Sequence, residues 1–173
     1  NGVYFSIGVA DSNYDSAAFG YVYGGSGSTA SYLGMSLYGQ AVTHRTYATE
    51  FTPGSNNAID LGNSSLGWKN FYLAGAMIAT PQALSGAGAI NLTTTSTDFT
   101  STGAAQALTL ANGTVGQIKT ITHIVDGGSG VLTPTTKTGY TTITFTNAGD
   151  SVTLRYCTTA GWCIIGSFGV TIA

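Results

Sequence analysis

Charged side chains are scarce in this sequence of 173 residues. Lys and Arg number five and Asp and Glu seven, so 7% of the residues are charged and the net charge is −2; an ordinary soluble domain has about 25%. The chain offers no basic patch to neutralise phosphates, which argues against nucleic-acid binding and against charge-driven membrane binding. So little charge also gives little repulsion between copies. We therefore expect a homo-oligomer, in which partner subunits cover much of the surface.

Long apolar runs and helix-forming segments are missing as well. No run reaches the roughly 20 residues of a transmembrane helix, and no signal-peptide pattern is present, so we expect no membrane insertion. The chain opens at Asn1 rather than Met, which suggests a fragment of a longer polypeptide. Gly (25 residues) and Thr (28 residues) recur throughout. Because Thr, Val, Ile and Tyr favour extended backbone, we predict an all-β protein.

Residue types that carry catalysis or bind metals are few. Neither His44 nor His123 has a Cys or carboxylate partner at metal-ligand spacing. Either could still bind a metal on an oligomer axis. The simpler interpretation of His123 is an ordinary half-exposed strand residue. Asp11 and Asp15 are the only acidic residues close in sequence; a loose cation site is the alternative there to an ordinary loop. We predict no catalytic residue, no metal ligand and no cofactor.

Three further carboxylates, Asp60, Asp126 and Asp150, stand beside turn residues. At such positions a carboxylate accepts hydrogen bonds from its own backbone, so we predict turn-capping roles for all three.

The two cysteines flank a short predicted turn. A hairpin centred on Ala160 would place Cys157 and Cys163 opposite each other, within disulfide range. Two buried free thiols are the simpler alternative, and the sequence leaves both open.

The β pattern divides the chain into three predicted segments. Residues 1–52 form a Gly/Ser/Tyr-rich β region, either a small sheet or an intertwined shaft; residues 53–82 form a connector, with a short strand at residues 68–73; and residues 83–173 form an antiparallel, jelly-roll-like β-sandwich. In the last segment, residues 141–146 alternate strictly, which directs Ile143 and Phe145 inward. Short strands at intervals of 8–12 residues favour a sandwich.

Most of the ten tyrosines lie in the first segment. An aromatic ring can stack on a sugar ring, and it can equally pack on a half-wet sheet. The candidates for ligand contact are Tyr14, Tyr21, Tyr23, Tyr32 and Tyr38.

Two stretches resemble known virion proteins. Residues 57–75, NAIDLGNSSLGWKNFYLAG, resemble a phage tail-fibre motif that reads D-L-G, a few polar residues, W-K, then Y/L-x-G. The resemblance implies structural roles in which Asp60 and Gly62 form a turn while Trp68 and Tyr72 fold back onto the shaft. Segments at residues 83–92, 107–113, 116–121, 125–128 and 143–154 resemble a β domain that recurs at the ends of marine-phage virion proteins.

Together these resemblances imply a non-enzymatic virion structural protein at the particle surface. They suggest a trimeric, tail-fibre-like module that contacts other virion proteins of the tail or capsid and contributes to host attachment through a surface glycan or receptor. A capsid head fibre or decoration protein is a close alternative. A polysaccharide-degrading tailspike or a secreted carbohydrate-binding adhesin is a more distant one. Many fibres end in a self-cleaving chaperone region with helical segments. Nothing after Lys69 looks helical here, so we expect that such a region is either absent or has been removed.

Overall fold

The computed structural model describes residues 2–8, 16–37, 44–47, 50–53, 55, 61–62 and 65–173. It divides the chain into two compact units, Asn1–Tyr72 and Leu73–Ala173. The described residues form fifteen strands and no helix, which confirms the all-β prediction. None of the described segments is a helix that could cross a membrane. The predicted three-segment division stays a prediction.

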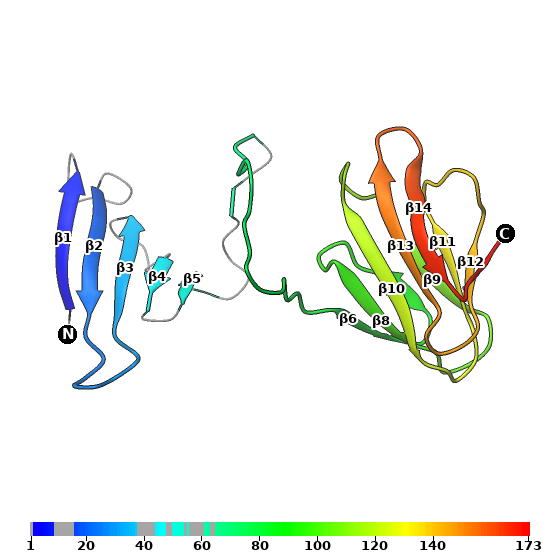
Figure 1. Cartoon of the computed structure of the whole chain (residues 1–173), viewed down its shortest axis with the longest axis horizontal. Coiled ribbons are helices and arrows are strands. Elements are labelled where there is room, and N and C mark those ends of the chain that lie inside the picture. Colours follow the sequence, from blue (N-terminus) through cyan, green and yellow to red (C-terminus); the bar gives the residue numbers. More distant parts are fainter. Residues whose placement is uncertain are drawn as a thin grey trace. The chain divides into compact units, whose positions relative to one another are not determined.

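The first unit contains one sheet, in which each strand pairs with the next in antiparallel fashion (Figure 1). Its five strands are β1 (Gly2–Gly8), β2 (Ser16–Val22), β3 (Tyr32–Leu37), β4 (His44–Thr46) and β5 (Phe51–Pro53). All five lie in the β region predicted for residues 1–52, except that β5 ends at Pro53. A small N-terminal sheet is therefore what the structure contains.

The second unit is a sandwich of two five-stranded sheets (Figure 1). One sheet has the order β14-β13-β10-β8-β6 and the other β15-β12-β11-β9-β7. The strands are β6 (Gln82–Ser85), β7 (Gly88–Ile90), β8 (Ser96–Thr100), β9 (Gln106–Leu110), β10 (Ile118–Val125), β11 (Gly130–Pro134), β12 (Ile143–Phe145), β13 (Ser151–Cys157), β14 (Gly161–Phe168) and β15 (Thr171–Ile172).

The sandwich is mixed, which corrects the antiparallel arrangement expected from sequence. From β6 to β11 consecutive strands alternate between the two sheets, and neighbours within each sheet are parallel. The chain thus makes three turns of a flattened coil, as in β-solenoids. Strands β12 and β13 then pair antiparallel with β11 and β10, and β15 and β14 extend the two sheets.

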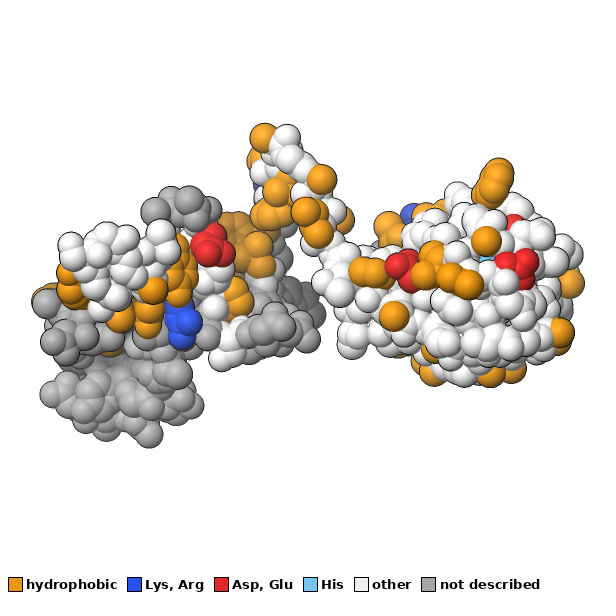
Figure 2. All heavy atoms as spheres, turned by 90° about the horizontal axis from the view of Figure 1, so that it is seen from below, with side chains coloured by type: hydrophobic (Ala, Val, Ile, Leu, Met, Phe, Trp, Pro, Cys, Tyr) orange, Lys and Arg blue, Asp and Glu red, His pale blue; other side chains and the backbone are white. Residues whose placement is uncertain are grey.

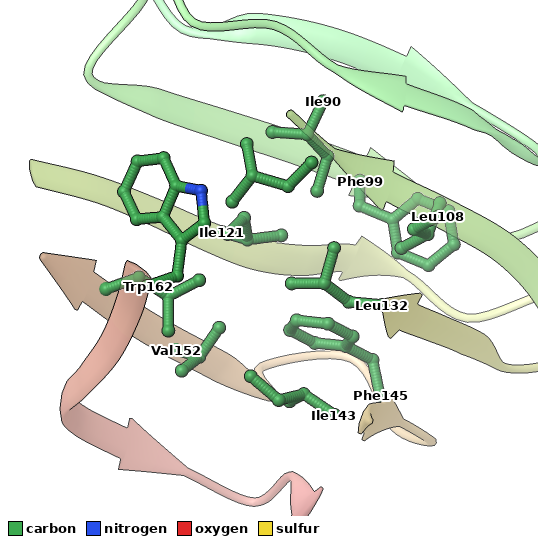
Figure 3. Close-up of a cluster of buried hydrophobic side chains, with 11 residues drawn as sticks. Ile90, Phe99, Leu108, Ile121, Leu132, Ile143, Phe145, Val152 and Trp162 are labelled. Atoms are coloured by element: carbon green, nitrogen blue, oxygen red, sulfur yellow. The ribbon is translucent and has the colours of Figure 1, made fainter. Parts of the chain in front are cut away.

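The core lies between these two sheets (Figure 3). Strand alternation directs every second side chain inward, and Ile143 and Phe145 are fully buried as predicted. The Phe99 and Phe145 rings meet edge to face with centroids 6.3 Å apart. Trp162 is fully buried, and its Nε1 donates to the carbonyl oxygen of Ala111 at 2.8 Å. The other buried apolar residues are Ile90, Leu108, Leu110, Ile121, Leu132, Val152 and Leu154.

Candidate functional site

The N-terminal sheet has two unlike faces. Strand register aligns Phe5, Phe19, Met35 and His44 in one cross-strand row, and Tyr21, Leu33, Thr46 and Phe51 in the next. Because residues directly opposite each other share a face, these two rows form one surface, which we call the open face. Phe5 is 65% exposed, Phe19 48% and Phe51 58%. The open face is therefore apolar and accessible in the single chain.

The other face of this sheet, which we call the glycine face, is narrow and better covered. Gly20 and Gly34 are both buried there and lie side by side in the register, next to Arg45. The Arg45 guanidinium lies 5.1 Å from the centre of the Tyr32 ring, a cation–π contact. The Tyr32 ring in turn lies 5.3 Å from that of Tyr47.

The described tyrosines among those predicted to contact a ligand do not all lie on one face of the sheet. Tyr21 and Tyr23 are half exposed, with ring centroids 6.5 Å apart. Tyr32 pairs with Val22 and so belongs to the glycine face. Tyr14 and Tyr38 lie outside the described residues. A carbohydrate contact at Tyr21 and Tyr23 stays a prediction.

The connector residues differ from their expected arrangement. Residues 68–73 form no strand, and Trp68 and Tyr72 are 68% and 88% exposed. Both side chains are therefore exposed in the single chain, and their folding back onto the shaft stays a prediction. Gly62 has a φ of +91°, which suits the turn expected there, and a Cβ atom at this position would lie 3.4 Å from Trp68 Cδ1. Asp60 lies outside the described residues.

Cys157 and Cys163 are free thiols of intermediate exposure. The hairpin is centred one residue from where an opposed pair would require, because Cys157 lies opposite Gly161 and Cys163 opposite Arg155. The expected face-to-face arrangement is therefore wrong, and the two cysteines are diagonal neighbours. A hydrogen bond from Cys163 lowers the pKa of Cys157, helped by the adjacent Arg155, and the same contact raises the pKa of Cys163.

A buried Ser–His pair lies at one end of the sandwich. His123 Nε2 is 2.8 Å from Ser101 Oγ, and its Nδ1 is 3.0 Å from the carbonyl oxygen of Asn147. Since a carbonyl only accepts, Nδ1 carries the proton and Nε2 accepts from Ser101. The half-exposed His123 expected from sequence is thus wrong, because both residues are buried. No substrate can reach this pair as it stands, and its bonds fix two loops instead.

Lys119 is a second buried polar residue that sequence reasoning missed. It occupies an inward position of β10. Its Nζ donates to the carbonyl oxygen of Thr94 at 2.9 Å, Thr94 Oγ1 at 2.8 Å and the carbonyl oxygen of Ser96 at 3.3 Å, with Asn91 Oδ1 at 3.5 Å. Burial lowers the pKa of Lys119 to about 8. The ammonium thus binds the loop before β8 from inside.

Two of the described carboxylates, Asp126 and Asp150, cap turns. Asp126 Oδ1 accepts from the backbone of Gly128, and Asp150 Oδ2 accepts from the backbones of Thr146 and Asn147. Both turn predictions are confirmed. Asp11 and Asp15 lie outside the described residues, and within those residues no group of three or more His, Cys, Asp or Glu side chains could hold a metal.

A groove in the second unit has a volume of about 560 Å³. It runs beside β8 and β10 and is lined by Met77, Leu92, Gln117, Ile118 and a run of Thr and Ser hydroxyls. No charged side chain lines it, so it offers neither an acid nor a base for catalysis. Shape and hydroxyl groups are what it presents to a ligand.

Comparison with known proteins gives no matching family model, no matching curated protein and no matching solved structure. The function is therefore inferred from the residues and their geometry.

Proposed function

We propose that this chain is a structural module of a virus particle, similar to a tail fibre, that works as a homotrimer on the particle surface. The observation that carries the proposal is the accessible apolar surface on a chain with almost no charge. Soluble monomers rarely expose large contiguous apolar patches, and net charge keeps them apart. Figure 2 shows how few charged side chains lie among the hydrophobic and neutral ones on the face that it presents.

The connector adds to this surface. Leu66, Trp68, Phe71 and Tyr72 are all more than two-thirds exposed, and they belong to the segment that resembles a fibre motif. A free monomer would leave these side chains in water. In an intertwined trimer the same residues lie between chains, where their burial stabilises the assembly by about 25 cal/mol per Å². The accessible titratable residues supply no comparable support for an enzyme.

Sedimentation equilibrium of the purified chain over a wide concentration range tests the proposal. The expected mass is three times the 17.6 kDa of one chain, with no dissociation at micromolar concentration. In such a trimer, separating the subunits also costs part of the free energy of unfolding. A well-behaved monomer, or release of reducing sugars from a host polysaccharide, would contradict the proposal.

Cross-linking on intact particles separates the tail-fibre proposal from its close alternative. Contacts with tail proteins are expected for a fibre-like module. Contacts with the major capsid protein would instead favour a head fibre or decoration protein.

A further inference from the structure

The N-terminal sheet is a single layer in the chain by itself. Its open face exposes two aligned rows of mostly apolar side chains that cross from β1 to β5. Sheets are stable when a hydrophobic face packs against a second layer, and domains are generally built from two such layers. The open face therefore needs a covering layer.

The glycine face cannot provide this stability. The adjacent Gly20 and Gly34 have no side chain to pack, and glycine in a strand interior weakens it. Arg45 and Tyr32 already cover part of that face through their own contact. The sheet consequently depends on what packs against Phe19 and its neighbours.

The composition of the open face points to copies of this chain as the covering layer. The two rows of the open face contain no Lys, Arg, Asp or Glu, so the face neither repels a copy of itself nor selects a partner by charge. In a symmetric ring the same patch from each subunit can meet around one axis. Identical apolar rows suit that arrangement because each row meets its own equivalent.

The area of the open face sets how much surface assembly removes from water. Twenty-six residues in five strands, spaced about 3.3 Å along and 4.8 Å between strands, give a flat face of roughly 400 Å². Three such faces together remove on the order of 1,200 Å² from water, shared among three pairwise contacts.

We propose that the open faces of three copies pack against one another and form a shared apolar core around the oligomer axis. This inference rests on the proposed homotrimer and specifies where its subunits meet. It assigns Tyr21 to subunit assembly rather than to sugar binding, because Tyr21 lies in the second row beside Leu33.

Phe19→Glu tests the proposal, since it places a carboxylate in the middle of the first row. In an isolated chain Phe19 is half exposed, so a charge there is tolerated. In a shared core the same carboxylate is desolvated without a partner in each of three copies. We expect Phe19→Glu to reduce the mass from trimer to monomer in sedimentation equilibrium, while Phe19→Leu keeps the trimer.

Two matched controls carry the same new charge elsewhere. Phe168→Glu replaces a Phe that is 73% exposed on β14, in the other unit. Thr52→Glu stays in the N-terminal sheet on the glycine face, opposite Arg45, where an opposite-charge pair is favourable. Both variants should remain trimeric.

The outcomes separate this inference from the proposed function. A trimeric Phe19→Glu chain, or dissociation in all three charge variants, overturns the shared core while the trimer itself stands. A monomeric wild-type chain overturns both. Dissociation confined to Phe19→Glu supports the shared core.

Discussion

At the residue scale, the second unit combines an apolar core with buried polar side chains that hydrogen-bond to its loops. Lys119 and the pair Ser101–His123 sit at inward positions, where an apolar side chain would be the usual choice, and each bonds loop backbone. Buried polar groups are tolerated when their hydrogen bonds are made and costly when they are not. These residues therefore fix the loops at the ends of the coil instead of adding apolar packing.

Lys119 should make the protein more stable as the pH rises through mildly alkaline values. Its folded pKa is about 8, lowered from 10.5 by burial, so above pH 8 the unfolded chain holds a proton that the folded chain has lost. The unfolded state then binds more protons, and the free energy of unfolding increases with pH, by about 1–3 kcal/mol up to the pKa of the unfolded chain. Below pH 8 both states are protonated and this contribution does not change.

Urea unfolding followed by Trp fluorescence between pH 7 and pH 9.5 measures this effect. The Lys119→Met variant should lose the increase. Tyr140, whose pKa burial raises to about 12, acts in the opposite direction only above this window. An equal slope in wild type and Lys119→Met would assign the pH dependence to other groups.

At the element scale, the coil of β6 to β11 requires close approach between its layers. Gly130 begins β11 and lies directly beneath the Phe99 ring; a Cβ atom there would be 2.5 Å from Phe99 Cε1 and 3.1 Å from Leu108 Cδ1. Both neighbours are buried, and close packing in a protein core leaves little room for such a shift. Gly130 is therefore fixed by packing, since its φ does not require glycine.

Gly130→Ala should lower the free energy of unfolding by about 1–3 kcal/mol, the usual cost of inserting a methyl group into a close-packed core. Gly166→Ala on β14 is the matched control, because a Cβ there meets no atom within 4 Å. Its effect should stay within about 0.5 kcal/mol. Equal stability of the two variants in urea unfolding would show that the core adjusts around Phe99.

At the scale of the whole molecule, the two units differ in how they are stabilised. Among the described residues, the buried apolar residues of the core all come from the second unit, between Ile90 and Trp162. The first unit has an exposed apolar face instead. The second unit should fold on its own, and the stability of the first unit should depend on oligomer assembly.

A fragment of residues 73–173 tests this division. It should unfold cooperatively in urea, with Trp162 reporting the loss of the core, and it should sediment as a monomer because the open face is missing. A fragment that is unfolded would show that its core depends on the first unit. A fragment that remains trimeric would move the subunit interface to the sandwich.

The sequence by itself determined the fold class and the strands with clear alternation. Ile143 and Phe145 alternate with Thr, and this period of two is a local property that survives any tertiary arrangement. Asp126 and Asp150 were predictable as turn caps for the same reason, because each bonds backbone within four residues.

Tertiary structure alone decided the coiled path of β6 to β11, the register of the cysteine hairpin and the hydrogen bonds of the buried polar side chains. Strands β6, β7, β8 and β11 have three to five residues and little apolar alternation, so pairing with parallel neighbours, not local preference, makes them strands. A shift of hairpin centre from Ala160 to Thr159 moves Cys163 opposite Arg155, and residue types do not set that shift. Whether Lys119 and His123 face water or loop oxygens depends on contacts more than twenty residues away, which only the folded chain brings together.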